Sequence, residues 1–79
     1  MTIEIKTEDF ARYGATLSIV LGLCRANPRQ NAKQMAEKLR MSDEQVRRYL
    51  QELERIGILE RIYDPRGVGR PKLVGVKML

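Results

Sequence analysis

The sequence contains no histidine, no tryptophan and a single cysteine, Cys24. Without histidine, neither a serine–histidine catalytic centre nor a histidine metal site can form. One cysteine cannot close an internal disulfide or build a tetrahedral thiolate site, and its scarcity is compatible with a reducing cytosol. The chain also has no phosphate-cradling loop with a following lysine and hydroxyl residue. We therefore expect a protein that is not an enzyme and that needs no metal or cofactor.

Long apolar runs are also missing. The longest, at 17–24, is interrupted by Ser18 and Gly22, and it is far shorter than the roughly 20 residues that a membrane-spanning helix needs. The first residues do not have the pattern of a secretory signal. These features predict no membrane partner.

The composition is that of one small globular domain over residues 1–79. Hydrophobic residues make up 43% of the chain and charged residues 32%, a balance that favours folding over disorder. Fifteen basic against ten acidic residues give a net charge of +5. A basic domain of this size favours a polyanionic partner.

The first part of the chain predicts an arm and a helix. Residues 1–6 alternate between polar and apolar, which indicates a short strand or an ordered arm. Residues 8–26 have helical periodicity, and Asn27-Pro28 ends the pattern. The expected inner stripe consists of Phe10, Tyr13, Leu17, Val20, Leu21 and Cys24.

The helix over 8–26 has a second apolar face, made by Ala11, Ala15, Ile19 and Leu23. A helix on a protein surface normally keeps one face polar. The second face is therefore covered either by the arm or by another copy of the protein. We expect a homodimer formed through this helix and the arm, with cover from within the chain as the alternative.

Residues 31–56 predict two helices joined by a tight turn. Asn31 precedes a helix over 32–39, and Ser42 opens the next helix with Gln45 completing a capping box. Gly57 is a natural helix end. Residues 58–79 then change to the branched and alternating pattern of a β-hairpin with a long, turn-rich tip.

Two helices followed at once by a hairpin form a winged helix-turn-helix, an α+β fold that is mostly α: three helices, the hairpin wing and the arm. Residues 31–78 resemble this domain in prokaryotic and archaeal transcription regulators of the MarR-like and ArsR-like group. Segments 35–39, 46–50 and 53–61 carry the resemblance. It implies double-stranded DNA as the partner, with the helix after Ser42 in the recognition role.

An α-helix fits the major groove of DNA, where arginine can read guanine and glutamine can read adenine. The expected inner stripe of this helix consists of Val46, Tyr49, Leu50, Leu53 and Ile56, which leaves the opposite face free. The resemblance places the recognition role on this face, and the predicted contacts are Ser42, Gln45, Arg47, Arg48 and Gln51. The alternative is that Arg47 and Arg48 only pair with nearby glutamates.

The acidic start of this helix, Asp43-Glu44, departs from related recognition helices. These carboxylates repel phosphate, although Glu44 can also accept a hydrogen bond from cytosine or simply stabilise the helix start. They count against a mode in which this helix binds DNA tightly and without regard to base sequence.

The hairpin and the preceding helix supply further cations. Arg66, Arg70 and Lys72 surround the hairpin tip, and Gly69-Arg70-Pro71 resembles the core of an AT-hook, which binds the minor groove. Lys33 and Gln34 lie at the start of the helix over 32–39, where backbone N–H groups can meet a phosphate. An ordinary solvated hairpin tip is the alternative.

The leading hypothesis is a sequence-specific DNA-binding transcription regulator, cytoplasmic and associated with the nucleoid. The competing hypothesis is a winged helix that binds other proteins and has no affinity for DNA. The two-faced first helix and the Asp43-Glu44 pair permit the second hypothesis, whereas the basic wing favours the first.

Overall fold

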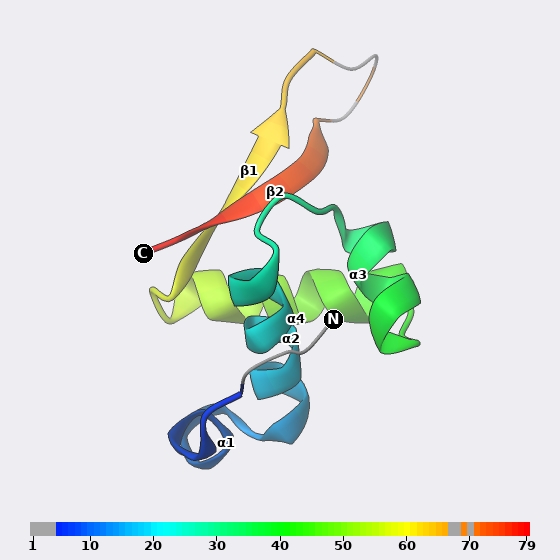
Figure 1. The fold of residues 1–79 in the computed structure, drawn as a ribbon. Coiled ribbons are helices and arrows are strands. Elements are labelled where there is room, and N and C mark those ends of the chain that lie inside the picture. The colour runs from blue at the N-terminus through cyan, green and yellow to red at the C-terminus, as the bar shows by residue number, and fades with distance from the viewer. Residues whose placement is uncertain (1–4, 67–68, 70) are drawn as a thin grey trace.

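The computed structural model describes residues 5–66, 69 and 71–79. Four helices form the body of the molecule: α1 (Thr7–Tyr13), α2 (Ala15–Ala26), α3 (Ala32–Leu39) and α4 (Asp43–Arg55). An antiparallel hairpin of β1 (Leu59–Asp64) and β2 (Lys72–Met78) follows and projects from the body, away from α1 (Figure 1). The arrangement confirms the expected fold class, α+β and mostly α with a hairpin wing.

The prediction of one helix over 8–26 is wrong, because the chain breaks at Gly14. This residue has φ +81° and ψ 160°, which no α-helix contains and which glycine adopts at little cost. The break turns α1 away from the line of α2 (Figure 1). As a result Phe10 leaves the predicted inner stripe and is 41% exposed.

The turn at Gly14 brings a carboxylate of α1 against α2 instead. Asp9 is buried, and its Oδ2 accepts a hydrogen bond of 2.7 Å from Arg25.

On the predicted second apolar face, Ala11 and Ala15 are exposed, Ile19 is half-buried and Leu23 is buried. Residues 1–4 of the predicted arm lie outside the described residues.

The helix-turn-helix forms as its caps predict. Asn31 accepts a hydrogen bond from the backbone N–H of Gln34, and Ser42 accepts one from that of Gln45, so each helix starts with a complete capping box. Between them Arg40 takes a left-handed conformation with φ +54° and reverses the chain. Each cap satisfies backbone groups that a helix start otherwise leaves unpaired.

The hydrophobic core lies between α2, α3, α4 and the hairpin. Val46, Leu50 and Leu53 of the stripe predicted for α4 are buried, whereas Tyr49 is half-buried and the prediction is wrong for Ile56, which is exposed at the end of the helix. Cys24 is fully buried, as expected for a small hydrophobic residue, and burial raises the pKa of its thiol to about 12. None of the helices in the described residues is long and apolar enough to cross a membrane.

The hairpin is bonded through both of its outer edges, on one side to α4 and on the other to the loop after α2. In β1, the backbone N–H of Arg61 donates to the Glu54 carboxylate at 2.9 Å. In β2, the N–H of Val76 donates to the carbonyl of Pro28 at 2.8 Å. Arg61 and Val76 are partners in the strand register, so both anchors lie on the same rung of the hairpin.

Gly75 allows the loop after α2 to approach the hairpin closely. A Cβ atom at this position would lie 2.6 Å from the carbonyl oxygen of Pro28. Because that oxygen belongs to the backbone, a change of side-chain rotamer cannot relieve the clash. We expect Gly75→Ala to lower the free energy of unfolding by about 1–3 kcal/mol, since the loop and the strand must separate. Urea denaturation followed by circular dichroism measures the change.

Lys77→Ala is the matched control, because Lys77 lies on the same strand with an exposed side chain. Its effect should stay within about 0.5 kcal/mol. Equal stability of Gly75→Ala and the wild type would show that the loop yields at no cost.

Candidate nucleic-acid interface

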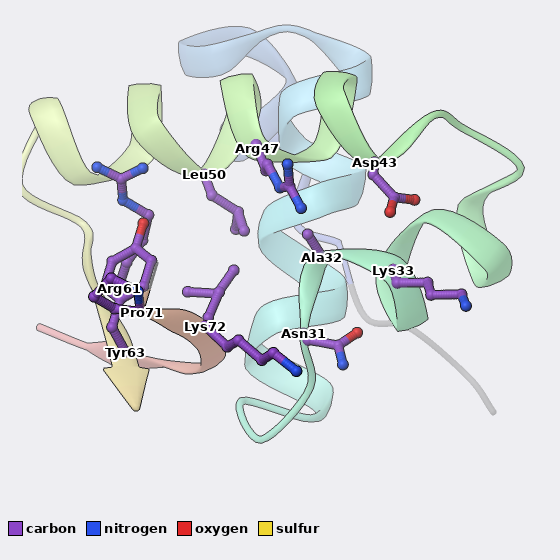
Figure 2. Close-up of a pocket in the computed structure, with 11 residues that line it drawn as sticks. Asn31, Ala32, Lys33, Asp43, Arg47, Leu50, Arg61, Tyr63, Pro71 and Lys72 are labelled. Atoms are coloured by element: carbon purple, nitrogen blue, oxygen red, sulfur yellow. The ribbon is translucent and has the colours of Figure 1, made fainter. Parts of the chain in front are cut away.

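A groove of about 510 Å³ separates the helix-turn-helix from the wing. The start of α3, the inner side of α4 and both strands contribute to its wall, so it joins elements that are far apart in the sequence (Figure 2). The lining residues are Asn31, Ala32, Lys33, Asp43, Arg47, Leu50, Arg61, Tyr63, Pro71, Lys72 and Leu73.

The groove carries mainly positive charge. Lys33 comes from α3, Arg47 from α4 and Lys72 from β2, and all three side chains are exposed. Figure 2 shows Arg47 reaching from α4 into the groove, while Lys72 extends across it toward Asn31. Asp43 is the acidic residue in the lining. Three predicted DNA contacts are thus brought together on one side of the molecule.

The capping boxes engage other predicted contacts. Oε1 of Gln34 accepts a hydrogen bond from the N–H of Asn31 at 2.8 Å, and Oε1 of Gln45 accepts one from Ser42 at 3.2 Å. Reading adenine requires both the oxygen and the nitrogen of an amide. While the caps stay intact, Gln34 and Gln45 offer mainly their Nε2 donors.

Arg48 makes an ion pair with a nearby glutamate, as the alternative to a DNA contact expected. Its guanidinium lies 3.0 Å from Glu44, one helical turn earlier, and both side chains are exposed. Such exposed pairs contribute little to stability, so Arg48 can leave Glu44 at small cost. Glu52 instead pairs with Arg55. Arg48 and Gln51 are exposed but do not line the groove.

The tip of the wing is described in part. Arg66 is exposed and donates to Oδ1 of Asp64 through its backbone N–H and through Nε. Gly69 has φ +92°, a conformation that favours glycine. Arg70, the centre of the AT-hook resemblance, lies outside the described residues.

Two residues of the groove did not emerge as functional candidates from the sequence. Tyr63 is 45% exposed, and it lines the groove together with Pro71. Arg61 lines the same wall. Strand alternation puts Arg61 and Tyr63 on the face of the hairpin that Leu59 turns toward the core, and this signal was available in the sequence.

The position of this wall is fixed by an ion pair between α4 and β1. Nη2 of Arg61 lies 2.9 Å from Glu54, and Nε donates to the same carboxylate at 3.1 Å. These side-chain bonds, together with the one from the Arg61 N–H, lower the pKa of Glu54. The side-chain bonds to Glu54 also raise the pKa of Arg61. Arg61 also lies 5.8 Å from the ring centre of Tyr63.

A capped two-helix unit, a buried stripe on its second helix and a hairpin anchored beside it define a winged helix-turn-helix. The family model for winged helix-turn-helix DNA-binding domains matches residues 20–60, and the chain belongs to this family. The match confirms the resemblance at the level of the family; the narrower MarR-like and ArsR-like likeness stays a prediction. Searches among curated proteins and among solved structures gave no match.

Glu54→Gln should reveal the ion pair through its pH dependence. Because the pKa of Glu54 is lowered by folding, the pair stabilises the protein above the ordinary value of 4.5, and this contribution is lost as the pH falls through the folded-state pKa. We expect the variant to be less stable by about 1 kcal/mol at neutral pH, since the pair is partly exposed. Urea titrations from neutral pH down to acid measure the difference, which should shrink in acid.

Glu52→Gln is the control, because Glu52 pairs with Arg55 at the surface. Its effect should be smaller and should disappear in high salt. A stability difference for Glu54→Gln that does not change with pH would contradict the role given to the carboxylate charge.

Proposed function

We propose that the protein is a transcription regulator that binds double-stranded DNA sequence-specifically, with α4 in the major groove and the wing in or near the minor groove. The observation that carries the proposal is the cationic groove, in which Lys33, Arg47 and Lys72 come together from three elements. The family supports DNA binding in general. The net charge of +5 favours association with a polyanion.

The proposed roles divide into positioning and reading. Lys33 and the N-terminal turn of α3 would meet a phosphate, which fixes the register without reading sequence. Arg47 is the first candidate for a base contact, because it reaches into the groove and has no ion-pair partner among the described residues. Arg48 would act after release from Glu44, with Gln45, Gln51 and Ser42 as further contacts.

The wing would add contacts beyond the major groove. Lys72 and Arg66 are exposed on the two sides of the tip and would contact phosphates. On its sequence pattern alone, Arg70 would enter a narrow A·T-rich minor groove. A homodimer through the segment 8–26, which forms α1 and α2, and through the arm would present two copies of α4 to half-sites about 34–36 Å apart. DNA binding of this kind implies a cytoplasmic, nucleoid-associated protein.

A protein-interaction module without DNA affinity is the second candidate. It is favoured by Asp43 and Glu44, because their carboxylates lie in the first turn of α4 and repel phosphate. The two candidates differ in one direct measurement, the affinity for duplex DNA.

Duplexes selected from random DNA should bind with a strong dependence on salt. Each phosphate contact releases a counterion, so log K should fall with log salt with a slope near −0.9 per contact. Fluorescence anisotropy at several salt concentrations measures the slope. No binding to any duplex at low salt, combined with capture of a defined protein partner, would favour the second candidate.

Arg47→Ala should reduce discrimination between the selected site and a mutated site, by about 1–3 kcal/mol if Arg47 forks onto a guanine. Lys72→Ala should weaken both sites alike and reduce the salt slope by about one. Arg55→Ala is the matched control, since Arg55 lies on the last turn of α4 and pairs with Glu52. Equal losses for Arg47→Ala and Arg55→Ala would remove Arg47 from the reading role.

A further inference from the structure

A second groove lies on the back of the wing, on the face opposite to Tyr63. It has a volume of about 600 Å³ and runs between the outer side of the hairpin and the loop that follows α2. Its lining residues are Pro28, Arg29, Ile62, Val74, Gly75, Val76, Lys77 and Met78. It shares no residue with the groove that faces α3 and α4.

The backbone creates this groove. Ile62 pairs with Gly75 and Tyr63 pairs with Leu73, so Val74 is an extra residue that bulges from β2. Gly75 carries no side chain at the point where Pro28 approaches. The bulge re-aims Val74, and the glycine leaves the floor open. The carbonyl of Pro28 and the N–H of Val76 bond to each other, so this part of the floor presents no unpaired polar group.

The groove combines an exposed apolar floor with a cationic rim. Ile62 is 42% exposed and Val74 is 45% exposed, although hydrophobic side chains of this size are usually buried. Arg29 and Lys77 supply the rim, and the ion pairs found among the described residues include neither. Glu60 lies opposite Lys77 in the strand register and tempers its charge, but it does not line the groove.

The apolar floor and the cationic rim together indicate which occupant the groove fits, because its volume is close to that of the groove beside α4. A stable protein interface buries about 800 Å² on each partner. The exposed hydrophobic surface of this groove comes mainly from Ile62 and Val74, and two side chains supply much less area than that. Its volume falls in the range of about 300–1,000 Å³ that is typical of small-molecule sites, which are mostly apolar with a few polar groups.

We propose that this groove binds a small amphipathic organic anion, with its apolar body on Ile62 and Val74 and its carboxylate or sulfonate between Arg29 and Lys77. The proposal is independent of DNA binding, because none of these residues has a role there. Such a ligand would contact both the wing and the loop after α2.

The test compares naphthoate with naphthalenemethanol, two probes of similar shape of which only the first is charged. Amide NMR spectra of the full chain should show shifts for naphthoate concentrated at residues 28–29, 62 and 74–78. The neutral probe should bind about fivefold or more weakly, as expected when partly exposed ion pairs are lost.

Two exposed positions test the floor and the rim separately. Ile62→Gln should weaken both probes, whereas Lys77→Glu should weaken naphthoate alone. Phe10→Gln and Arg12→Glu are the matched controls, because Phe10 is 41% exposed and Arg12 is exposed on α1, away from the wing. Circular dichroism verifies that each variant is folded.

Three results would overturn the proposal. Shifts spread over the whole surface would mean non-specific adsorption. Equal affinity for the two probes would show that the negative charge of the ligand does not contribute to binding. A wild-type protein that is dimeric in sedimentation and becomes monomeric in Ile62→Gln would show that a second copy covers the groove.

Discussion

The hairpin is hydrogen-bonded to α4 and to the loop after α2 at one rung, where Arg61 of β1 lies opposite Val76 of β2. An antiparallel hairpin on its own is marginal in water, and the edges of this one carry N–H groups that a sheet leaves unpaired. Glu54 accepts from one edge and Pro28 from the other. The direction of the wing, and with it the shape of both grooves, depends on this rung.

The two anchors differ in kind. Glu54 holds Arg61 by its backbone and its guanidinium, so this anchor is partly ionic and responds to pH and salt. The anchor at Pro28 is a backbone hydrogen bond made possible by the missing side chain of Gly75, and it does not titrate. The α4 side of the wing is therefore electrostatically sensitive, whereas its other side is held by close packing.

Local signals in the sequence were sufficient for much of this fold. The caps at Asn31 and Ser42 and the buried stripe of α4 follow from spacing alone, since each depends on residues within one or two helical turns. The break at Gly14 was missed because the apolar periodicity continues through it, although a glycine within a helix is a warning. The exposure of Phe10 follows from that break.

The site was harder to predict than the fold, because its geometry is not local. Lys33, Arg47 and Lys72 were named from the sequence, but their meeting in one groove depends on how the wing is anchored. The groove on the back of the wing gave no sequence signal, since it requires the bulge at Val74 and the approach of Pro28 to Gly75. Each of the two grooves is formed by residues that are far apart in the chain.

The rung also separates the two faces of the wing. Strand alternation sends Tyr63 and Leu73 to the groove beside α4, and it sends Ile62 to the opposite groove. The bulge at Val74 lies between these sets and gives the second face an additional apolar side chain. Because both faces share the same two strands, any molecule that shifts the hairpin from behind must also move Lys72 relative to Arg47. The spacing of those two cations would then change without contact at either one.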